Sequence, residues 1–308
     1  VIVGLGMVGI AFLEKMLNED TAQEYTYLII GEEPYYAYNR VGLTGFFEHR
    51  EFEKLLLVPQ SFYEGRNADR WDYRIDEAVV KVSKEEKFVQ TSSGNKYEYN
   101  HLVFATGSTA LLPLEMLPAP KDVDPNDPQN YRQMGCFVYR TIDDLNSMVA
   151  FSEKLKESVK KPTKKRAVVV GGGLLGLEAA KALLDMGIYD NVTVVHRSKW
   201  LLSQQLDEKG GNLLTEKVTD LNVTARTGTL VEKLIFDKDG KLSHVRYNND
   251  EEDECQLLCY TIGIKPRDEL AKEAGILTSQ RGGVTIDNYM KTSDPNIYAI
   301  GECASWND

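Results

Sequence analysis

A glycine-rich turn between a strand and a helix occurs twice in this chain and constrains the fold more than any other feature. The clearer copy has the pattern Gly-x-Gly-x-x-Gly, with Gly171, Gly173 and Gly176. It follows the apolar run 166–170 and precedes a helical run, after which a second strand is expected at 191–195. In such a βαβ unit the pattern binds the pyrophosphate of a dinucleotide. The first glycine permits the tight turn, the second lets the backbone approach the ligand, and the third lets the helix pack closely on the strand.

The other copy stands at the start of the chain. Gly4, Gly6 and Gly9 follow the strand-like residues 1–3, and a second strand is expected at 25–30. Two such units in one chain suggest two nucleotides, FAD and NAD(P), because each copy keeps its strand, glycines and helix. The alternative is that one turn is a degenerate structural copy. The sequence therefore predicts an α/β fold with two Rossmann-like dinucleotide-binding domains.

Charged residues after the first unit are candidates for contacts with a nucleotide. Glu32 and Glu33 follow the expected second strand, and Arg40 lies in the aromatic-rich segment after them. Arginine binds phosphate in a bidentate manner, so Arg40 could clamp a pyrophosphate. The alternative is a solvated arginine in an aromatic loop.

The second unit carries a different pair at the matching place. NAD-selective folds have an acid there, about 20 residues after the glycine turn, which binds the ribose 2′-hydroxyl. This chain has His196 and Arg197 instead. A cationic pair suits a 2′-phosphate, so we expect NADPH to be accepted, with or without NADH. The alternative is a surface arginine without a ligand.

Composition argues against several classes of partner. The chain has 308 residues, of which 42% are hydrophobic and 27% charged, as in ordinary globular domains. Its net charge of −11 argues against nucleic acid and anionic membrane surfaces. No apolar run approaches the roughly 20 residues of a transmembrane helix. Val1 lies inside a strand without an initiator Met, so we expect the chain to be part of a longer protein.

The four cysteines indicate neither a metal site nor a redox motif. None of Cys136, Cys255, Cys259 and Cys303 forms Cys-x-x-Cys, so a zinc cluster or thioredoxin-type dithiol is not expected. Alternation places Cys255 and Cys259 on one face of a strand, where we interpret them as small core residues. A redox pair is the alternative. Reduced thiols fit a cytoplasmic location.

Each half of the chain repeats a larger pattern. A buried-looking strand ends in the turn Thr106-Gly107, and a later strand ends in a turn that contains Thr261 and Gly263. Each half also has short strands around polar turns, which predicts an antiparallel insert in each domain. The expected boundaries are an FAD-binding domain at 1–137 and 267–308, with an NAD(P)-binding domain at 138–266 between its two segments.

In this order, over nearly the whole chain, the motifs resemble the two-dinucleotide flavoprotein reductases of the pyridine nucleotide-disulfide oxidoreductase superfamily. The closing pattern Thr-Ser-x-Pro, then Ala-x-Gly-Glu, at 292–302 is part of this resemblance. The resemblance implies that the first glycine turn holds FAD, that an acid after the second strand binds the adenosine ribose, and that the closing Gly-Glu contacts the ribityl chain. It also implies cofactor contacts at the two Thr/Gly turns. The residues so assigned are Gly4, Gly6, Gly9, Glu32 or Glu33, Thr106, Gly107, Gly263, Gly301 and Glu302.

A narrower resemblance is to the N-terminal reductase part of assimilatory nitrite reductase, most of all the fungal type. It is carried by residues 33–41, 138–141, 172–179, 205–207 and 301–306. In that family electrons pass from NAD(P)H through FAD to iron–sulfur and siroheme centres, which reduce nitrite to ammonium. Those centres need cysteine clusters that this chain lacks. The resemblance therefore implies an electron-input part, whose partners are NAD(P)H and downstream redox domains of the same polypeptide, and a final helix that lies beyond residue 308.

The resemblance implies hydride transfer from nicotinamide to flavin, in which the protein orients the two cofactors. Glu178, two residues past Gly176, resembles the family's acid near the nicotinamide; the alternative is an acid that serves only the helix dipole. Residues 40–50 lack the cysteine pair of the disulfide-reductase branch, and Thr44-Gly45 stands where another branch has a lysine. We therefore expect catalysis without a thiol. Other functions to be weighed are a stand-alone ferredoxin- or rubredoxin-type reductase, an NADH oxidase, and a flavin-binding scaffold without turnover.

Overall fold

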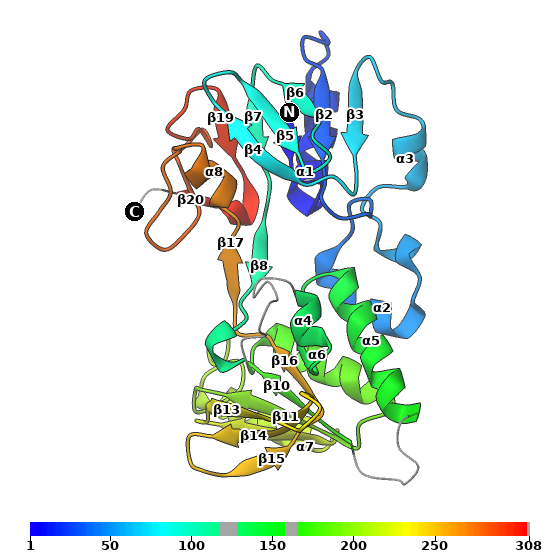
Figure 1. Cartoon of the computed structure of the whole chain (residues 1–308), viewed down its shortest axis with the longest axis vertical. Helices are drawn as coiled ribbons and strands as arrows, with labels where there is room; N and C mark the ends of the chain where they lie inside the picture. Colours follow the sequence, from blue (N-terminus) through cyan, green and yellow to red (C-terminus); the bar gives the residue numbers. More distant parts are fainter. Residues whose placement is uncertain (118–127, 158–164, 307–308) are drawn as a thin grey trace. The chain divides into compact units, whose positions relative to one another are not determined.

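A computed structural model of the chain describes residues 1–117, 128–157 and 165–306. The chain divides into two compact units, and Figure 1 labels most of their helices and strands. Unit 1 comprises Val1–Gly42, Glu51–Thr109 and Ile264–Asp308, and unit 2 comprises Leu43–Arg50 and Ala110–Gly263. Each unit contains a five-stranded sheet whose neighbouring strands pair in parallel. The mixed α/β fold with parallel sheets that the sequence predicts is confirmed.

Unit 1 is built on a sheet with the strand order β19-β7-β1-β2-β3. These strands are Ile297–Ala299 (β19), Leu102–Phe104 (β7), Ile2–Val3 (β1), Tyr27–Ile30 (β2) and Trp71–Arg74 (β3). Val79–Ser83 (β4), Phe88–Thr91 (β5) and Lys96–Glu98 (β6) form an antiparallel sheet. Ser108–Ala110 (β8) pairs with Ile264–Pro266 (β17), and Val284–Ile286 (β18) with Ala304–Trp306 (β20). The helices are Met7–Glu19 (α1), Gln60–Glu64 (α3) and Glu269–Glu273 (α8).

Both faces of the unit 1 sheet are covered, which explains why its inner strands β7, β1 and β2 are apolar at successive positions. Alternate residues belong to different hydrophobic clusters. Ile2 and Ile29 pack in a cluster with Ile10 and Leu13 of α1. Their neighbours, such as Val3, pack in another cluster that includes residues of the antiparallel sheet β4–β6. The sheet therefore lies between a helical layer and a β layer.

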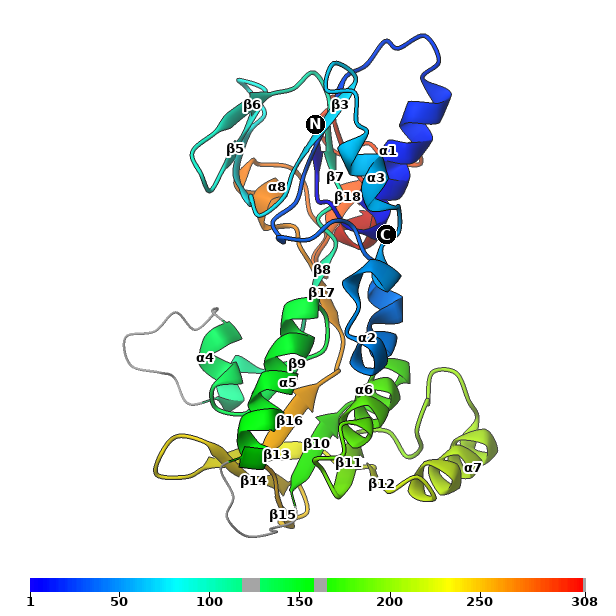
Figure 2. The ribbon, with the colours of Figure 1, turned by 90° about the vertical axis from the view of Figure 1, so that its right-hand side faces the viewer.

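Unit 2 repeats this arrangement with the strand order β12-β11-β10-β16-β9. The strands are Val223–Thr227 (β12), Asn191–His196 (β11), Arg166–Val170 (β10), Leu257–Tyr260 (β16) and Cys136–Val138 (β9). Val231–Phe236 (β13), Leu242–Tyr247 (β14) and Glu252–Glu254 (β15) form the antiparallel insert. The helices are Leu43–His49 (α2), Pro128–Arg132 (α4), Ile142–Glu157 (α5), Leu174–Asp185 (α6) and Glu208–Thr219 (α7). Figure 2 shows α6 beside β10 and β11, and α7 beside β12.

The units change at 109/110 and 263/264, whereas the sequence-based boundaries lie at 137/138 and 266/267. One element on which the two divisions differ is β9, whose residue Phe137 pairs with Cys259 of β16 as the edge strand of the unit 2 sheet. A strand of three residues is too short to show a hydrophobic period. The short segment Leu43–Arg50 also belongs to unit 2, where α2 contacts α6.

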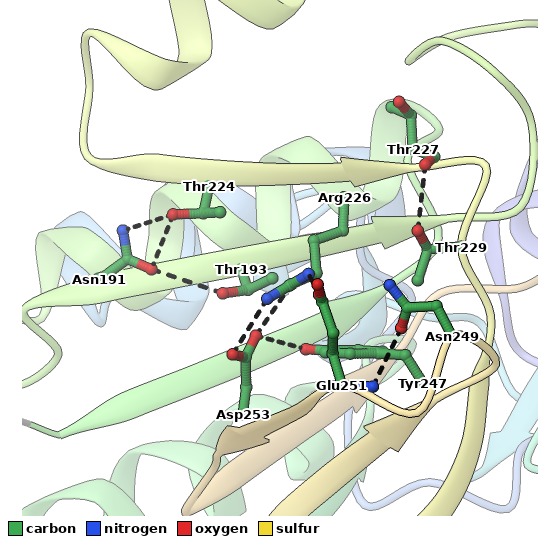
Figure 3. A network of polar contacts seen from close by, with 10 residues as sticks. All are labelled: Asn191, Thr193, Thr224, Arg226, Thr227, Thr229, Tyr247, Asn249, Glu251 and Asp253. Carbon is green, nitrogen blue, oxygen red and sulfur yellow. Dashed lines mark hydrogen bonds and ion pairs between the residues drawn. The ribbon is translucent and has the colours of Figure 1, made fainter.

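Arg226 joins the edge strand β12 to the antiparallel insert of unit 2 (Figure 3). Its Nε and Nη2 donate to the two carboxylate oxygens of Asp253 at 3.0 and 3.2 Å, and its Nη1 donates to Glu251 at 2.5 Å. The Tyr247 hydroxyl also donates to Asp253, at 2.8 Å, and the guanidinium carbon lies 4.6 Å from the Tyr247 ring centroid. One guanidinium thus satisfies two acids and stacks on an aromatic ring.

We expect Arg226→Ala to lower the free energy of unfolding by about 1–3 kcal/mol, because Asp253 loses its charged partner in a half-buried place. Urea denaturation of the cofactor-free protein measures the change. Arg246→Ala is the control, since Arg246 pairs with Glu252 in a more exposed position on the same insert. An equal loss of stability in the two variants would contradict a special contribution of the Arg226 network.

Candidate functional sites at the carboxyl edges of the two parallel sheets

The first glycine turn lies between β1 and α1. Gly4 has φ +118°, and a Cβ there would lie 2.2 Å from the carbonyl oxygen of Ala105. A Cβ on Gly9 would lie 2.0 Å from the carbonyl oxygen of Gly4. Packing within the protein therefore requires glycine at both positions. A Cβ on Gly6 would meet no atom within 4 Å. Packing does not explain this glycine, and the open space in front of it can admit a ligand.

The other residues expected around this turn also lie at the ends of parallel strands. Glu32 follows β2, Thr106 follows β7, and Gly301 follows β19. A Cβ on Gly301, which has φ +75°, would lie 3.0 Å from a side-chain carbon of Val8 in α1. Ligands of parallel α/β sheets bind at this edge. The remaining expected residues are Gly107, which has φ +68°, and Glu302, which accepts a hydrogen bond from Ser108 at 2.7 Å.

Four charged residues pair with one another near this edge. Arg40 donates to Glu33 and, at 2.7 Å, to the Tyr38 hydroxyl, which itself donates to Glu33 at 2.7 Å. Arg267 donates through two guanidinium nitrogens to the two carboxylate oxygens of Glu32, at 2.6 Å for one pair. Burial raises the pKa of Glu32, but the hydrogen bonds and charge of Arg267 outweigh burial and lower it. Glu33 thus holds Arg40, and Glu32 is held by Arg267.

Sequence reasoning missed Arg267. The only local signal is its place directly after Pro266, close to the second Thr/Gly turn. Its partner Glu32 is 235 residues away in the chain, so no spacing rule could have connected the two.

The second glycine turn, between β10 and α6, has the same construction. Gly171 has φ +120°, and a Cβ there would lie 2.5 Å from the carbonyl oxygen of Thr261. A Cβ on Gly176 would lie 1.7 Å from the carbonyl oxygen of Gly171. A Cβ on Gly173 would meet no atom within 4 Å. In both units the outer glycines are required by packing, and the middle glycine faces open space.

The His196 side chain contacts the second glycine turn. The backbone N–H of Gly172 donates to its Nδ1 at 3.1 Å, and its Nε2 lies 3.2 Å from the Ser203 hydroxyl. A ring nitrogen that accepts an N–H carries no proton, so the imidazole is neutral. Burial lowers the pKa of His196, and the charge of Arg197 lowers it further. The positive charge expected of the pair is therefore carried at neutral pH by Arg197 alone, whose side chain is exposed.

Glu178 is the end of a chain of hydrogen bonds within unit 2. The Tyr139 hydroxyl donates to Thr44 Oγ1 at 3.1 Å, and Thr44 Oγ1 donates to Glu178 Oε2 at 3.2 Å. Burial raises the pKa of Tyr139, which keeps the phenol a neutral donor. Thr44 lies in α2, the segment that joins unit 2 from an earlier part of the chain. Gly263, the remaining expected residue, has φ +126° and accepts the Leu111 N–H at 3.0 Å.

All four cysteines are buried and unbonded to one another. Burial raises the pKa of Cys136 to about 12 and raises those of Cys255 and Cys259 as well. Since the thiolate is the reactive form, these positions fit core residues rather than a redox pair. In the part of the chain that the structure describes, no three His, Cys, Asp or Glu side chains gather as a metal site would require.

None of the helices in the described ranges has the length and apolar character needed to cross a bilayer.

Comparison with known proteins gives consistent matches. The family model of the pyridine nucleotide-disulphide oxidoreductases matches residues 1–307. A nitrite reductase [NAD(P)H] of Emericella nidulans is 41% identical over 99% of this chain and 26% of its own length. The nitrite reductase (NADH) large subunit of Escherichia coli is 36% identical over 100% of this chain and 33% of its own length. The chain thus spans about a quarter to a third of these relatives.

Solved structures show the same fold. An NAD-dependent persulfide reductase from A. fulgidus superposes with a TM-score of 0.81 over 98% of this chain and 53% of its own length, at 23% identity.

Proposed function

Because the chain belongs to the pyridine nucleotide-disulphide oxidoreductase family, we propose that it passes electrons from NAD(P)H to FAD. The observation that carries the proposal is the repeated glycine turn. In each turn packing requires the outer glycines, while Gly6 and Gly173 face space that a pyrophosphate can fill. We assign FAD to unit 1 and NAD(P)H to unit 2, each as a Rossmann-like domain, with unit 2 inserted in the sequence of unit 1.

In unit 1 the backbone and the charged cluster provide the contacts. The N-terminus of α1 directs free N–H groups and the positive end of the helix dipole toward the pyrophosphate. Arg40, held by Glu33 and Tyr38, adds a fixed positive charge. Glu32 accepts hydrogen bonds from the adenosine ribose. The Gly301-Glu302 turn contacts the ribityl chain, and the Thr106-Gly107 turn, which lies beside Gly4, contacts the cofactor there.

In unit 2 the N-terminus of α6 holds the second pyrophosphate in the same way. Arg197 is free to meet a 2′-phosphate, since its side chain is exposed and follows β11. Glu178 orients the nicotinamide. Thr44 donates a hydrogen bond to the Glu178 carboxylate, and Tyr139 in turn donates to Thr44. Bound flavin supplies the acceptor for the hydride, and the protein contributes orientation and exclusion of water.

The relatives named nitrite reductase are three to four times as long as this chain. We infer that the chain is the electron-input part of such an enzyme. Siroheme and iron–sulfur clusters in downstream domains would then receive the electrons and reduce nitrite to ammonium. This proposal rests on the identity of 36–41% over essentially the whole chain.

The experiment is anaerobic mixing of the FAD-loaded protein with NADPH or NADH. We expect the visible absorbance of oxidised flavin to disappear, and a downstream acceptor to restore it. If the protein binds FAD but neither nucleotide reduces it, the chain is a scaffold without turnover and the proposal is wrong.

Arg197→Glu should weaken binding of NADPH by about 10–100-fold and of NADH much less, because it replaces a charge-assisted contact to the 2′-phosphate by repulsion. Titration calorimetry of the FAD-loaded protein with NADP⁺ and NAD⁺ measures the two affinities. Lys233→Glu makes the same charge change at an exposed position elsewhere in unit 2. If Arg197→Glu weakened the binding of both nucleotides equally, Arg197 would not be the residue that contacts the 2′-phosphate.

A further inference from the structure

Arg267 is bonded to two parts of unit 1 that are distant in the chain. Its backbone N–H donates to the carbonyl oxygen of Gly107 at 3.0 Å, and its carbonyl oxygen accepts a hydrogen bond from Thr106 Oγ1 at 2.7 Å. Its side chain holds both carboxylate oxygens of Glu32. Main chain and side chain are therefore both anchored, which fixes the direction of the guanidinium group.

The two segments that Arg267 contacts, Thr106-Gly107 and Glu32, flank the first glycine turn. A Cβ on Gly4 would lie 3.1 Å from the backbone nitrogen of Thr106. Gly31, the residue before Glu32, is so close to Leu5 of the turn that a Cβ there would lie 2.7 Å from the Leu5 Cβ. Arg267 thus spans the carboxyl edge of the sheet from the end of β7 to the end of β2, around the residues that face the open space at Gly6.

The negative charges at this edge require a second positively charged residue besides Arg40. Glu32 and Glu33 are adjacent in the chain, at the same edge of the sheet as the glycine turn that would bind a doubly negative pyrophosphate. Arg40 pairs with Glu33, so Glu32 would repel the ligand if it had no partner of its own. Arg267 supplies that partner. A carboxylate has about four lone-pair sites, so Glu32 can bind Arg267 and still accept a hydrogen bond from a ribose hydroxyl.

We propose that Arg267 is a further residue of the FAD site, a positioning residue that orients Glu32 toward the adenosine ribose and offsets its charge. The inference rests on the proposed function of unit 1. It assigns a role to a residue that lies beyond the glycine turn and the acid, in the last segment of the unit.

The first test is the affinity of the cofactor-free protein for FAD, followed by quenching of flavin fluorescence. We expect Arg267→Gln to weaken binding by about 10-fold or more, because Glu32 keeps its charge without a partner. Arg267→Lys keeps the charge but loses the bidentate geometry, so its affinity for FAD should lie between those of the wild type and Arg267→Gln. Arg281→Gln, an exposed arginine of the same unit, is the control and should bind as the wild type does. Normal affinity of Arg267→Gln would overturn the inference.

The second test separates positioning from a general loss of structure. Arg267→Gln combined with Glu32→Gln leaves neither charge unpaired, so the double variant should bind FAD more tightly than Arg267→Gln alone. The wild type should also prefer FAD to its 2′-deoxyadenosine analogue, and Arg267→Gln should lose that preference. Additive effects, or an unchanged preference, would overturn the inference. If the wild type itself binds no FAD, the proposed function is wrong. If the wild type binds FAD and the Arg267 variants behave like it, only the inference about Arg267 is wrong.

Discussion

Gly176→Ala should nearly abolish reduction of the bound flavin by NAD(P)H. The new Cβ would lie 1.7 Å from the backbone oxygen of Gly171 and 2.9 Å from Thr261 Oγ1, so α6 must move away from β10. Overpacking of this kind costs about 1–3 kcal/mol of stability. A shift of about 1 Å in positioning groups slows a reaction by about 100-fold. Urea denaturation measures the stability, and stopped-flow absorbance measures the rate.

Gly173→Ala is the matched variant, since it adds the same methyl group three residues earlier in the same turn. Its Cβ meets no protein atom within 4 Å, so stability should not change. Affinity for NAD(P)H should nevertheless fall, because the methyl group enters the space assigned to the pyrophosphate. A loss of stability equal to that of Gly176→Ala, or an unchanged affinity, would contradict the assignment of this turn.

Thr44→Val should slow reduction of the flavin by about 10–100-fold while FAD remains bound. Valine keeps the shape of threonine but removes the hydroxyl that donates to Glu178 and accepts from Tyr139. The carboxylate then loses its fixed orientation, and catalytic groups must be held in place to be effective. Stopped-flow reduction at several NADPH concentrations separates the limiting rate, which should fall, from the affinity, which should change little.

Two further variants decide whether Thr44 acts through Glu178. Thr44→Ser keeps the hydroxyl and should react at nearly the wild-type rate. Glu178→Gln should be at least as slow as Thr44→Val, and the double variant should be no slower than Glu178→Gln, since the two residues act as one unit. If the rate of the double variant fell by the product of the two single fold-decreases, Thr44 would act independently of Glu178.

Local pattern by itself determined the two glycine turns and the mixed α/β fold. A strand, three glycines at fixed spacing and a helix occupy a continuous stretch of chain, so the periodicity of the sequence reports them directly. The structure shows that the outer glycines, such as Gly4 and Gly176, are required by backbone contacts within that stretch or with a neighbouring strand. The predicted burial of Cys255 and Cys259 is confirmed, but the expected reason is wrong, because Cys255 precedes β16 and every residue of β16 is buried.

Only the tertiary structure decided which distant residues meet. Arg267 reaches Glu32 across 235 positions, and Thr44 reaches Glu178 across 134. The neutral state of His196 follows from a bond to the Gly172 N–H, and β9 belongs to unit 2 because it pairs with β16. Hydrophobic periodicity tells which face of an element is buried, but not which element lies against it. Those pairings depend on the path of the whole chain, and they determine the orientation and charge of the side chains at both sites.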